Sequence, residues 1–344
     1  MTVRLASDEE IDNWDKHILA NPDGGNVFAS YEYAQQKETG GYKVKFLFVD
    51  DIALMVHEKN AYPLGKLWYL PKGPEVMDTK GLFSVLNELQ SFAAENGVFV
   101  IKIETELPRS IQPTLKRHGL VKSRPIIPNP STITLDISGK LDKILDNLPQ
   151  KGRHAIRRAE RDGVTVEPVK PTEKNCRAMF NLLSNTAEGQ FGIRSYDYYR
   201  SFWQRFADAN MGQLFFAYYD GKLAAGAFAM VFGKKSTYLV GASQRSRRVY
   251  GASHLLQWHV IKWVKSNGAL IHDLCGSPPT EEIDNPNHPH HGIGLFKKAF
   301  NKTVTDYIGC YDVVIRPIQY KIWAILGERI AKRIHYYKHH DSYY

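Results

Sequence analysis

The stretch Gln213–Phe232, QLFFAYYDGKLAAGAFAMVF, contains two apolar runs separated by Asp220-Gly221-Lys222. Asp-Gly between apolar runs is a strong local signal for a β-hairpin, because both residues tolerate the left-handed backbone of a tight turn. A similar pattern occurs earlier, where the runs Val44–Val49 and Ile52–His57 flank Asp50-Asp51. The sequence therefore predicts two hairpins whose turns lie 170 positions apart (220 − 50).

The segments after the two hairpins repeat in the same order. Each hairpin is followed by a strand pattern, an amphipathic helix, a helix-ending glycine and an apolar strand. The predicted elements are 67–70, 82–95 and 98–103 in the first copy, and 236–240, 253–266 and 269–274 in the second. The helix-ending glycines, Gly97 and Gly268, are 171 positions apart, and aromatic-rich helices (31–38 and 196–206) precede the hairpins. The repeat predicts an α/β protein with two copies of one unit, each a mixed sheet flanked by helices.

A domain boundary is expected near Gly139, because the proline-rich stretch Pro125–Pro130 precedes it. We predict a first domain of residues 1–138 plus 311–344, with the C-terminal helix packing back on it. The second domain is predicted to comprise residues 139–310. A chain of 344 residues is long enough for both domains to bury a core of their own.

The composition is that of a globular protein with a basic surplus. There are 45 Lys and Arg against 36 Asp and Glu, a net charge of +9, which favours nucleic acid, a diphosphate or an anionic membrane face as a partner. The N-terminus lacks the apolar core of a signal peptide, and the longest apolar stretches are too short to span a bilayer. Three widely spaced cysteines are typical of reduced thiols. These features predict a cytoplasmic protein.

The usual signatures of hydrolases, metalloproteases and P-loop enzymes are absent from the sequence. The loop Gly276–Gly294 carries His288, His290 and His291, but the carboxylates and thiolates of a metal site are missing at ligand spacing, so neither a metal nor a cofactor is expected. Arg248-x-x-Gly251-x-Ser253 is an imperfect version of the loop that cradles the pyrophosphate of coenzyme A. A coenzyme A-dependent N-acyltransferase therefore stays open as an alternative.

Two segments have the charge pattern of a binding surface. Arg153, Arg157 and Arg161 repeat at four-residue spacing and form either a phosphate-binding face for tRNA or a solvated helix face. Near the C-terminus, basic residues flank a predicted stripe of apolar side chains, Trp323, Leu326, Ile330 and Ile334. That helix either rests on an anionic membrane face or docks on the domain core. A non-catalytic protein that binds tRNA or membranes would use these same segments.

Several motifs in the second half resemble the FemABX family of aminoacyl-tRNA-dependent peptidyltransferases. The similar stretches are Tyr250–Trp263, Asn267-Gly268, His272–Gly276, Gly294–Phe300 and Tyr307–Asp312, and the resemblance extends over nearly the whole chain. A long coiled-coil hairpin is missing between Gly163 and Gln213, as in the compact FemX-type members.

The resemblance implies two tandem GNAT-like (acyltransferase-like) domains that transfer an amino acid from aminoacyl-tRNA to the stem peptide of a peptidoglycan precursor, in cell wall biogenesis. The acceptor is UDP-MurNAc-pentapeptide or lipid II. By the family pattern, Lys37 and Arg194 hold the acceptor's diphosphate, with Tyr198 and Tyr250 beside it, and Glu104 or Glu106 orients its amine. Phe296 and Lys297 are expected at the aminoacyl end, where Lys297 would stabilise the oxyanion. From the residues alone, Lys297 is predicted to be a surface lysine at a loop-to-strand junction.

Overall fold

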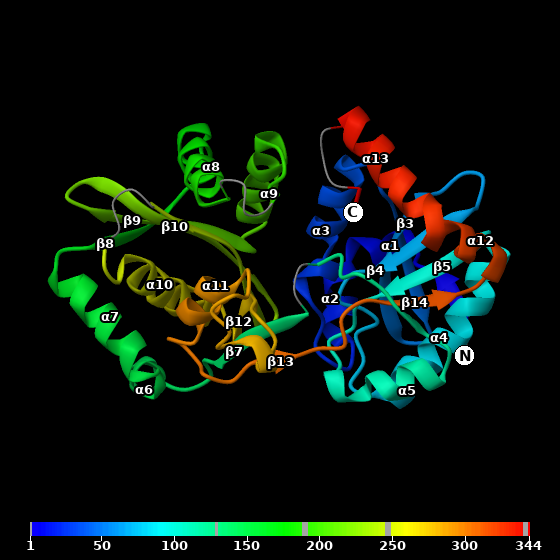
Figure 1. Cartoon of the computed structure of the whole chain (residues 1–344), viewed down its shortest axis with the longest axis horizontal. Helices are drawn as coiled ribbons and strands as arrows, with labels where there is room; N and C mark the ends of the chain where they lie inside the picture. The colour runs from blue at the N-terminus through cyan, green and yellow to red at the C-terminus, as the bar shows by residue number, and fades with distance from the viewer. Residues whose placement is uncertain (1, 128–129, 188–191, 245–248, 340–342) are drawn as a thin grey trace. The chain divides into compact units, whose positions relative to one another are not determined.

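The computed structural model describes residues 2–127, 130–187, 192–244, 249–339 and 343–344. The chain forms two compact units, one made of residues 1–130 with 306–344 and the other of residues 131–305, and each is built on a seven-stranded sheet (Figure 1). The division falls near residue 130 because β7 (Ser131–Asp136) pairs with β12 (Ile271–Gly276) in the second sheet. The domain limits predicted from the sequence are 138/139 and 310/311, a few residues later at both crossings.

The first sheet has the strand order β1-β2-β3-β4-β5-β14-β6. Its strands are β1 (Val3–Leu5), β2 (Lys43–Val49), β3 (Ile52–Asn60), β4 (Lys66–Leu70), β5 (Val98–Ile103), β6 (Val121–Lys122) and β14 (Tyr311–Val314). The predicted hairpin is confirmed, since β2 and β3 pair antiparallel up to Val49 and Ile52 around the Asp50-Asp51 turn. Helices α3 (Tyr31–Thr39) and α4 (Thr79–Glu95) also lie where they were predicted.

The second sheet has the order β13-β7-β12-β11-β10-β9-β8. The remaining strands are β8 (Thr165–Val169), β9 (Gly212–Tyr219), β10 (Lys222–Phe232), β11 (Lys235–Ser243) and β13 (Thr305–Asp306), and the helices are α6 (Leu141–Asn147), α7 (Gln150–Arg161), α8 (Glu173–Ala187), α9 (Tyr196–Asp208), α10 (Ala252–Ser266) and α11 (His291–Lys297). The second predicted hairpin is confirmed by the pairing of Tyr219 with Lys222. The duplicated order of strand hairpin, strand, helix and strand is thus present in both sheets.

Alternation of side chains along β9 explains why helices cover both faces of the second sheet. Phe215 points to the α10 face, where its ring lies 5.8 Å from that of Trp263. Phe216 points to the opposite face, because a Cβ atom added to Gly226 would meet both its ring and Met179 of α8, at 3.2 Å and 2.5 Å. Figure 1 shows α8 and α9 on that side of the sheet and α10 on the other. Successive side chains of a strand alternate between faces, so a continuous apolar run such as this indicates a strand buried on both sides.

The C-terminal segment packs against the first unit, as α12 (Pro317–Ile322), a π-helical turn (Trp323–Gly327) and α13 (Glu328–His339). Trp323 is buried and lies 5.7 Å from the ring of Phe99 on β5. The predicted stripe that groups Trp323 with Leu326, Ile330 and Ile334 is wrong, because those three side chains are exposed. The π-helical turn, with its wider repeat, separates Trp323 from the face that carries them.

Helix α7 makes two close backbone contacts inside the second unit, and both need a glycine because there is no room for a Cβ atom. A Cβ atom on Gly152 would lie 1.9 Å from the carbonyl oxygen of Ala299, and one on Gly251 would lie 2.3 Å from that of Ala155. Gly251 has φ +73°, immediately before α10. The backbone of α7 therefore packs directly on two segments: on Ala299, after α11, and on Gly251, before α10. Gly251 belongs to the turn that resembles a coenzyme A loop. The Arg248 end of that loop lies outside the described residues.

We expect Gly152→Ala to destabilise the protein, because the added methyl group meets a backbone carbonyl that cannot rotate away. Overpacking of this kind costs about 1–3 kcal/mol. The matched control is Gly139→Ala, where a Cβ atom meets nothing within 4 Å. Urea denaturation should show a lower midpoint for Gly152→Ala and an unchanged one for Gly139→Ala. Equal midpoints for both variants would contradict the close packing of α7.

Candidate functional site

The strands β11 and β12 part from each other in the second unit. They pair in parallel over only three residues, Lys235–Thr237 with Ile271–Asp273. In the first unit the corresponding strands β4 and β5 pair along their whole length, from Lys66 opposite Val98 to Leu70 opposite Ile103. The two copies of the unit therefore differ at this point, and the second sheet opens beyond Thr237.

The end of β12 beside this opening has an irregular backbone. The register between β12 and β7 shifts between Asp273 and Gly276, and Cys275 has a left-handed backbone with φ +59°. A carboxylate oxygen of Asp273 accepts a hydrogen bond from the Cys275 amide at 2.7 Å and another from the Thr132 hydroxyl. Left-handed backbone is strained for a residue other than glycine. The Asp273 side chain holds this turn in place.

Lys297 inserts its ammonium into the turn. It is the last residue of α11, its side chain is only 6% exposed, and its Nζ atom donates to the carbonyl oxygens of Cys275 at 2.8 Å and Gly276 at 2.6 Å. Burial lowers the pKa of Lys297 to about 8, and the nearby Cys275 and Asp273 partly oppose that shift. The surface position predicted from the residues alone is wrong, since α11 forms within the expected loop and carries this lysine inward.

Phe296 lies on an aromatic cluster next to Lys297. Its ring centroid is 5.1 Å from His254, 5.4 Å from Phe300 and 6.5 Å from Tyr238 on β11. Burial lowers the pKa of His254 to about 4, so this imidazole is neutral at pH 7. Lys297 is a buried cation, and a buried charge acts more strongly on a nearby negative charge than an exposed one.

A second buried polar cluster lies in the first unit and contains Lys37. This lysine is 7% exposed, and its Nζ atom lies 5.3 Å from the ring of Tyr33 and 5.5 Å from that of Tyr42. Both rings contact the fully buried His57, at 5.8 Å and 5.1 Å. The pKa of His57 is well below its usual value because of burial and of the positive charges of Lys37 and Lys59. Lys59 is 8% exposed and donates from its Nζ atom to the carbonyl oxygen of Tyr343, so the cluster places two buried lysines around a neutral imidazole.

Glu104 belongs to the same cluster, and Glu106 follows it two residues later in the chain. The Glu104 carboxylate accepts hydrogen bonds from the Tyr69 hydroxyl and from the Ile126 and Ile127 amides, and the ring of Tyr69 lies 5.9 Å from His57. Burial raises the pKa of Glu104, in opposition to these hydrogen bonds. Glu106 instead forms an ion pair with Lys72 at 3.2 Å. Glu104 is connected to Lys37 through Tyr69, His57 and Tyr33.

Arg194 and Tyr198 lie together at the start of α9. The guanidinium carbon of Arg194 is 4.5 Å from the Tyr198 ring centroid. Ser195 caps the helix by accepting a hydrogen bond from the Tyr198 amide, which places the Arg194 side chain over the first turn. This contact lies within the second unit, and the expected role of the two residues at the acceptor's diphosphate stays a prediction.

The basic helix α7 is divided between a structural and an exposed face. Arg153 donates to the backbone carbonyl oxygens of Asp146 and Leu148, so it caps the end of α6. Arg157 and Arg161 are exposed, with acidic neighbours at 3.8 Å and 3.9 Å. Sequence reasoning missed two further members of the exposed face, His154 and Arg158, which lie beside Tyr250. The Tyr250 hydroxyl is 3.3 Å from His154 Nδ1, and the guanidinium carbon of Arg158 is 4.9 Å from the Tyr250 ring centroid.

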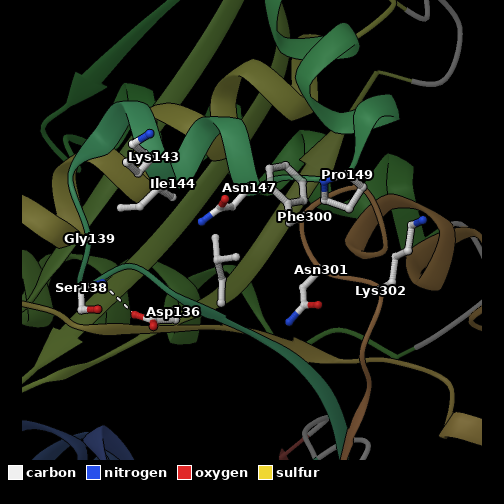
Figure 2. Close-up of a pocket in the computed structure, with 11 residues that line it drawn as sticks. Asp136, Ser138, Gly139, Lys143, Ile144, Asn147, Pro149, Phe300, Asn301 and Lys302 are labelled. Atoms are coloured by element: carbon white, nitrogen blue, oxygen red, sulfur yellow. Dashed lines mark hydrogen bonds between the residues drawn. The ribbon is translucent and has the colours of Figure 1, made fainter.

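A pocket of about 570 Å³ opens elsewhere in the second unit, between α6 and the segment after α11 (Figure 2). It is lined by Leu135, Asp136, Ser138, Gly139, Lys143, Ile144, Asn147, Pro149, Phe300, Asn301 and Lys302. Asp136 pairs with Ile271, whereas Gly276 pairs with Thr132, so the pocket and the Lys297 turn lie toward opposite ends of β7. At about 3.3 Å per strand residue the separation is roughly 13 Å. The pocket is therefore distinct from the Lys297 site.

In the part of the chain that the structure describes, no group of three His, Cys, Asp or Glu side chains could hold a metal ion. Among the same residues, helices with the length and hydropathy needed to cross a membrane are absent.

Comparison with known proteins agrees with this architecture. Residues 150–281 match the model of the "Acetyltransferase (GNAT) domain" family. A stretch of 113 residues is 29% identical to the lipid II:glycine glycyltransferases of Staphylococcus saprophyticus and Staphylococcus aureus. It covers 33% of this chain and 26% of those proteins, so the match spans about a quarter of their length.

Solved structures match over much more of the chain. FemX superposes with a TM-score of 0.79 at 17% identity, covering 95% of this chain and all of that one. The L-PGS structure from Bacillus licheniformis gives a TM-score of 0.54 at 13% identity, over 94% of this chain and 98% of that one. The expected tandem GNAT-like fold and the expected resemblance are confirmed at this level. The chain therefore has a FemX-like fold of two GNAT-like units, and one stretch of it has distant sequence similarity to the lipid II:glycine glycyltransferases.

Proposed function

We propose that this protein transfers an amino acid from aminoacyl-tRNA to an amine on the stem peptide of a peptidoglycan precursor. The observation that carries the proposal is the buried Lys297 ammonium at the opening between β11 and β12, together with the FemX-like fold. The attacking amine and the ester carbonyl of the charged tRNA form a tetrahedral intermediate whose oxyanion needs a cation or N–H donor. Lys297 supplies that cation, and the ribose hydroxyl leaves as the amide forms.

The other predicted residues take substrate-binding roles in this proposal. Lys37 and Arg194 bind the acceptor's diphosphate, with Tyr198 alongside Arg194. Glu104, in the same cluster as Lys37, orients the acceptor. Phe296 forms an apolar wall for the aminoacyl group. Because the described site lacks a histidine–carboxylate pair that could act as a general base, positioning of the two substrates and proton relay through the substrates supply most of the rate.

The direct test offers the protein a set of charged tRNAs with either UDP-MurNAc-pentapeptide or lipid II, and weighs the products. The proposal expects an acceptor heavier by one amino-acid residue, formed only when the tRNA is charged. Acetyl transfer from acetyl-coenzyme A without tRNA would instead establish the alternative N-acyltransferase, and binding of tRNA without any amide product would refute an enzymatic role.

Lys297→Met should lower kcat by about 10²–10³ with little change in the KM of the acceptor, because the missing cation acts on the transition state. Lys298→Met is the matched control, since this neighbouring lysine points to Asp284. The control should retain near wild-type turnover in the same assay. Similar kcat values for the two variants would remove Lys297 from the mechanism.

The pH dependence offers an independent check. A lysine with a pKa of about 8 loses its charge as pH rises through 8, about two units earlier than an ordinary lysine. The wild-type rate should therefore decline above pH 8. Lys297→Arg, whose guanidinium stays charged, should lack that descending limb whatever its absolute rate. A descending limb of equal position in both proteins would assign it to another group.

The tRNA is proposed to contact the exposed face of α7, which carries Arg157, Arg158 and Arg161 and has Tyr250 beside Arg158. Replacing Arg157 and Arg161 with Gln should weaken tRNA binding and lower the slope of log K against log salt by about one for each phosphate that the protein no longer neutralises. Arg177→Gln, on α8 and paired with Glu173, is the control. An unchanged slope in the α7 variant would show that this face does not meet the RNA.

A further inference from the structure

The exposed apolar side chains of the protein are concentrated on its C-terminal helix. Of the nineteen large hydrophobic side chains that are exposed among the described residues, eight lie between positions 318 and 337. They are Ile318, Ile322, Ile325, Leu326, Ile330, Ile334, Tyr336 and Tyr337, each between 48% and 75% exposed. Single exposed apolar residues are common, but such a contiguous row marks an interaction surface.

The opposite side of the same helix is firmly packed. Tyr320, Trp323 and Ala331 contact a core cluster with Leu67 and Phe99 of the first sheet. Gly327 lies close to the Trp323 ring, where an added Cβ atom would be 3.0 Å from it. The helix thus packs by the face that carries residues 320, 323, 327 and 331, and the exposed apolar side chains lie on its other face. The exposed row is therefore a property of the folded unit.

The charges of the C-terminal segment favour an anionic partner. Residues 317–339 contain five Lys and Arg and one acid, Glu328, for a net charge of +4. Glu328 turns toward Lys332 and the Tyr344 hydroxyl, at 3.0 Å and 2.9 Å. Arg329 and Arg333 alternate with the apolar row at helical spacing and are exposed. These two arginines and the eight apolar side chains together form the C-terminal face. An apolar stripe with interspersed basic residues and flanking tyrosines is complementary to the interface of an anionic bilayer.

We infer that the C-terminal face binds the surface of an anionic lipid membrane. The apolar side chains enter the interface between headgroups and acyl chains, and Arg329 and Arg333 pair with lipid phosphates. Basic residues near an anionic membrane surface strengthen binding through electrostatic attraction, which salt screens. This inference is independent of the transfer chemistry, because its residues lie outside the sites described above.

The test is co-sedimentation of the full chain with phosphatidylglycerol-containing vesicles and with pure phosphatidylcholine vesicles. The wild-type protein should bind the anionic vesicles, and added salt should weaken binding. Leu326→Gln with Ile330→Gln should lower the partition coefficient by about tenfold or more, because the polar side chains no longer insert. Arg329→Gln with Arg333→Gln should lower it similarly on anionic vesicles only.

Matched controls are Leu5→Gln with Met77→Gln, two exposed apolar residues elsewhere in the first unit, and Lys80→Gln with Lys116→Gln, two exposed cations. These controls should bind as the wild type does, and all the variants should have the wild-type melting temperature. Three outcomes would overturn the inference. They are a lack of binding to anionic vesicles, equal binding by the C-terminal and control variants, or a dimer in sedimentation velocity that the Leu326/Ile330 variant abolishes without lipid.

Discussion

The candidate site depends on one interaction, the bond of the Lys297 ammonium to the carbonyl oxygens of Cys275 and Gly276. Burying a charge is unfavourable unless strong acceptors compensate it, and two carbonyl dipoles aimed at one ammonium do so. The carbonyls converge because Cys275 adopts a left-handed backbone that Asp273 stabilises. The lysine reaches them because α11 ends at that position. An irregular strand end and a short helix together create the charged centre.

The two units share an element order but differ in how their central strands behave. In the first unit β4 and β5 stay paired, and the buried polar groups gather around His57 on β3. In the second unit β11 and β12 separate after Thr237, and Lys297 lies beside the separation. The two copies thus share one fold but carry different polar groups, the cluster around His57 in the first and the buried Lys297 in the second. In the proposal, the first copy contributes Lys37 to anion binding, and the second contributes Arg194 together with the cation that acts on the carbonyl.

The C-terminal helix shows how one element can serve both packing and binding. Trp323 and Gly327 secure it to the first sheet, and the exposed row faces outward. From the sequence, docking on the core and binding a membrane are alternatives. In the structure they are compatible, because the π-helical turn at Trp323–Gly327 directs Trp323 and Leu326 to different faces.

Hydrophobic periodicity and turn chemistry were enough to predict the duplicated α/β order, both hairpins and the positions of α3, α4, α9 and α10, because these signals are local. The pairing of β14 with β5, and of β7 with β12, was not predictable in this way. The paired strands come from distant parts of the chain, and such pairing has no local signature. Lys297 shows the same limit. Its neighbours in sequence indicate a surface residue, and only the fold of β12 and α11 buries it, because burial depends on contacts between segments that are far apart in the chain.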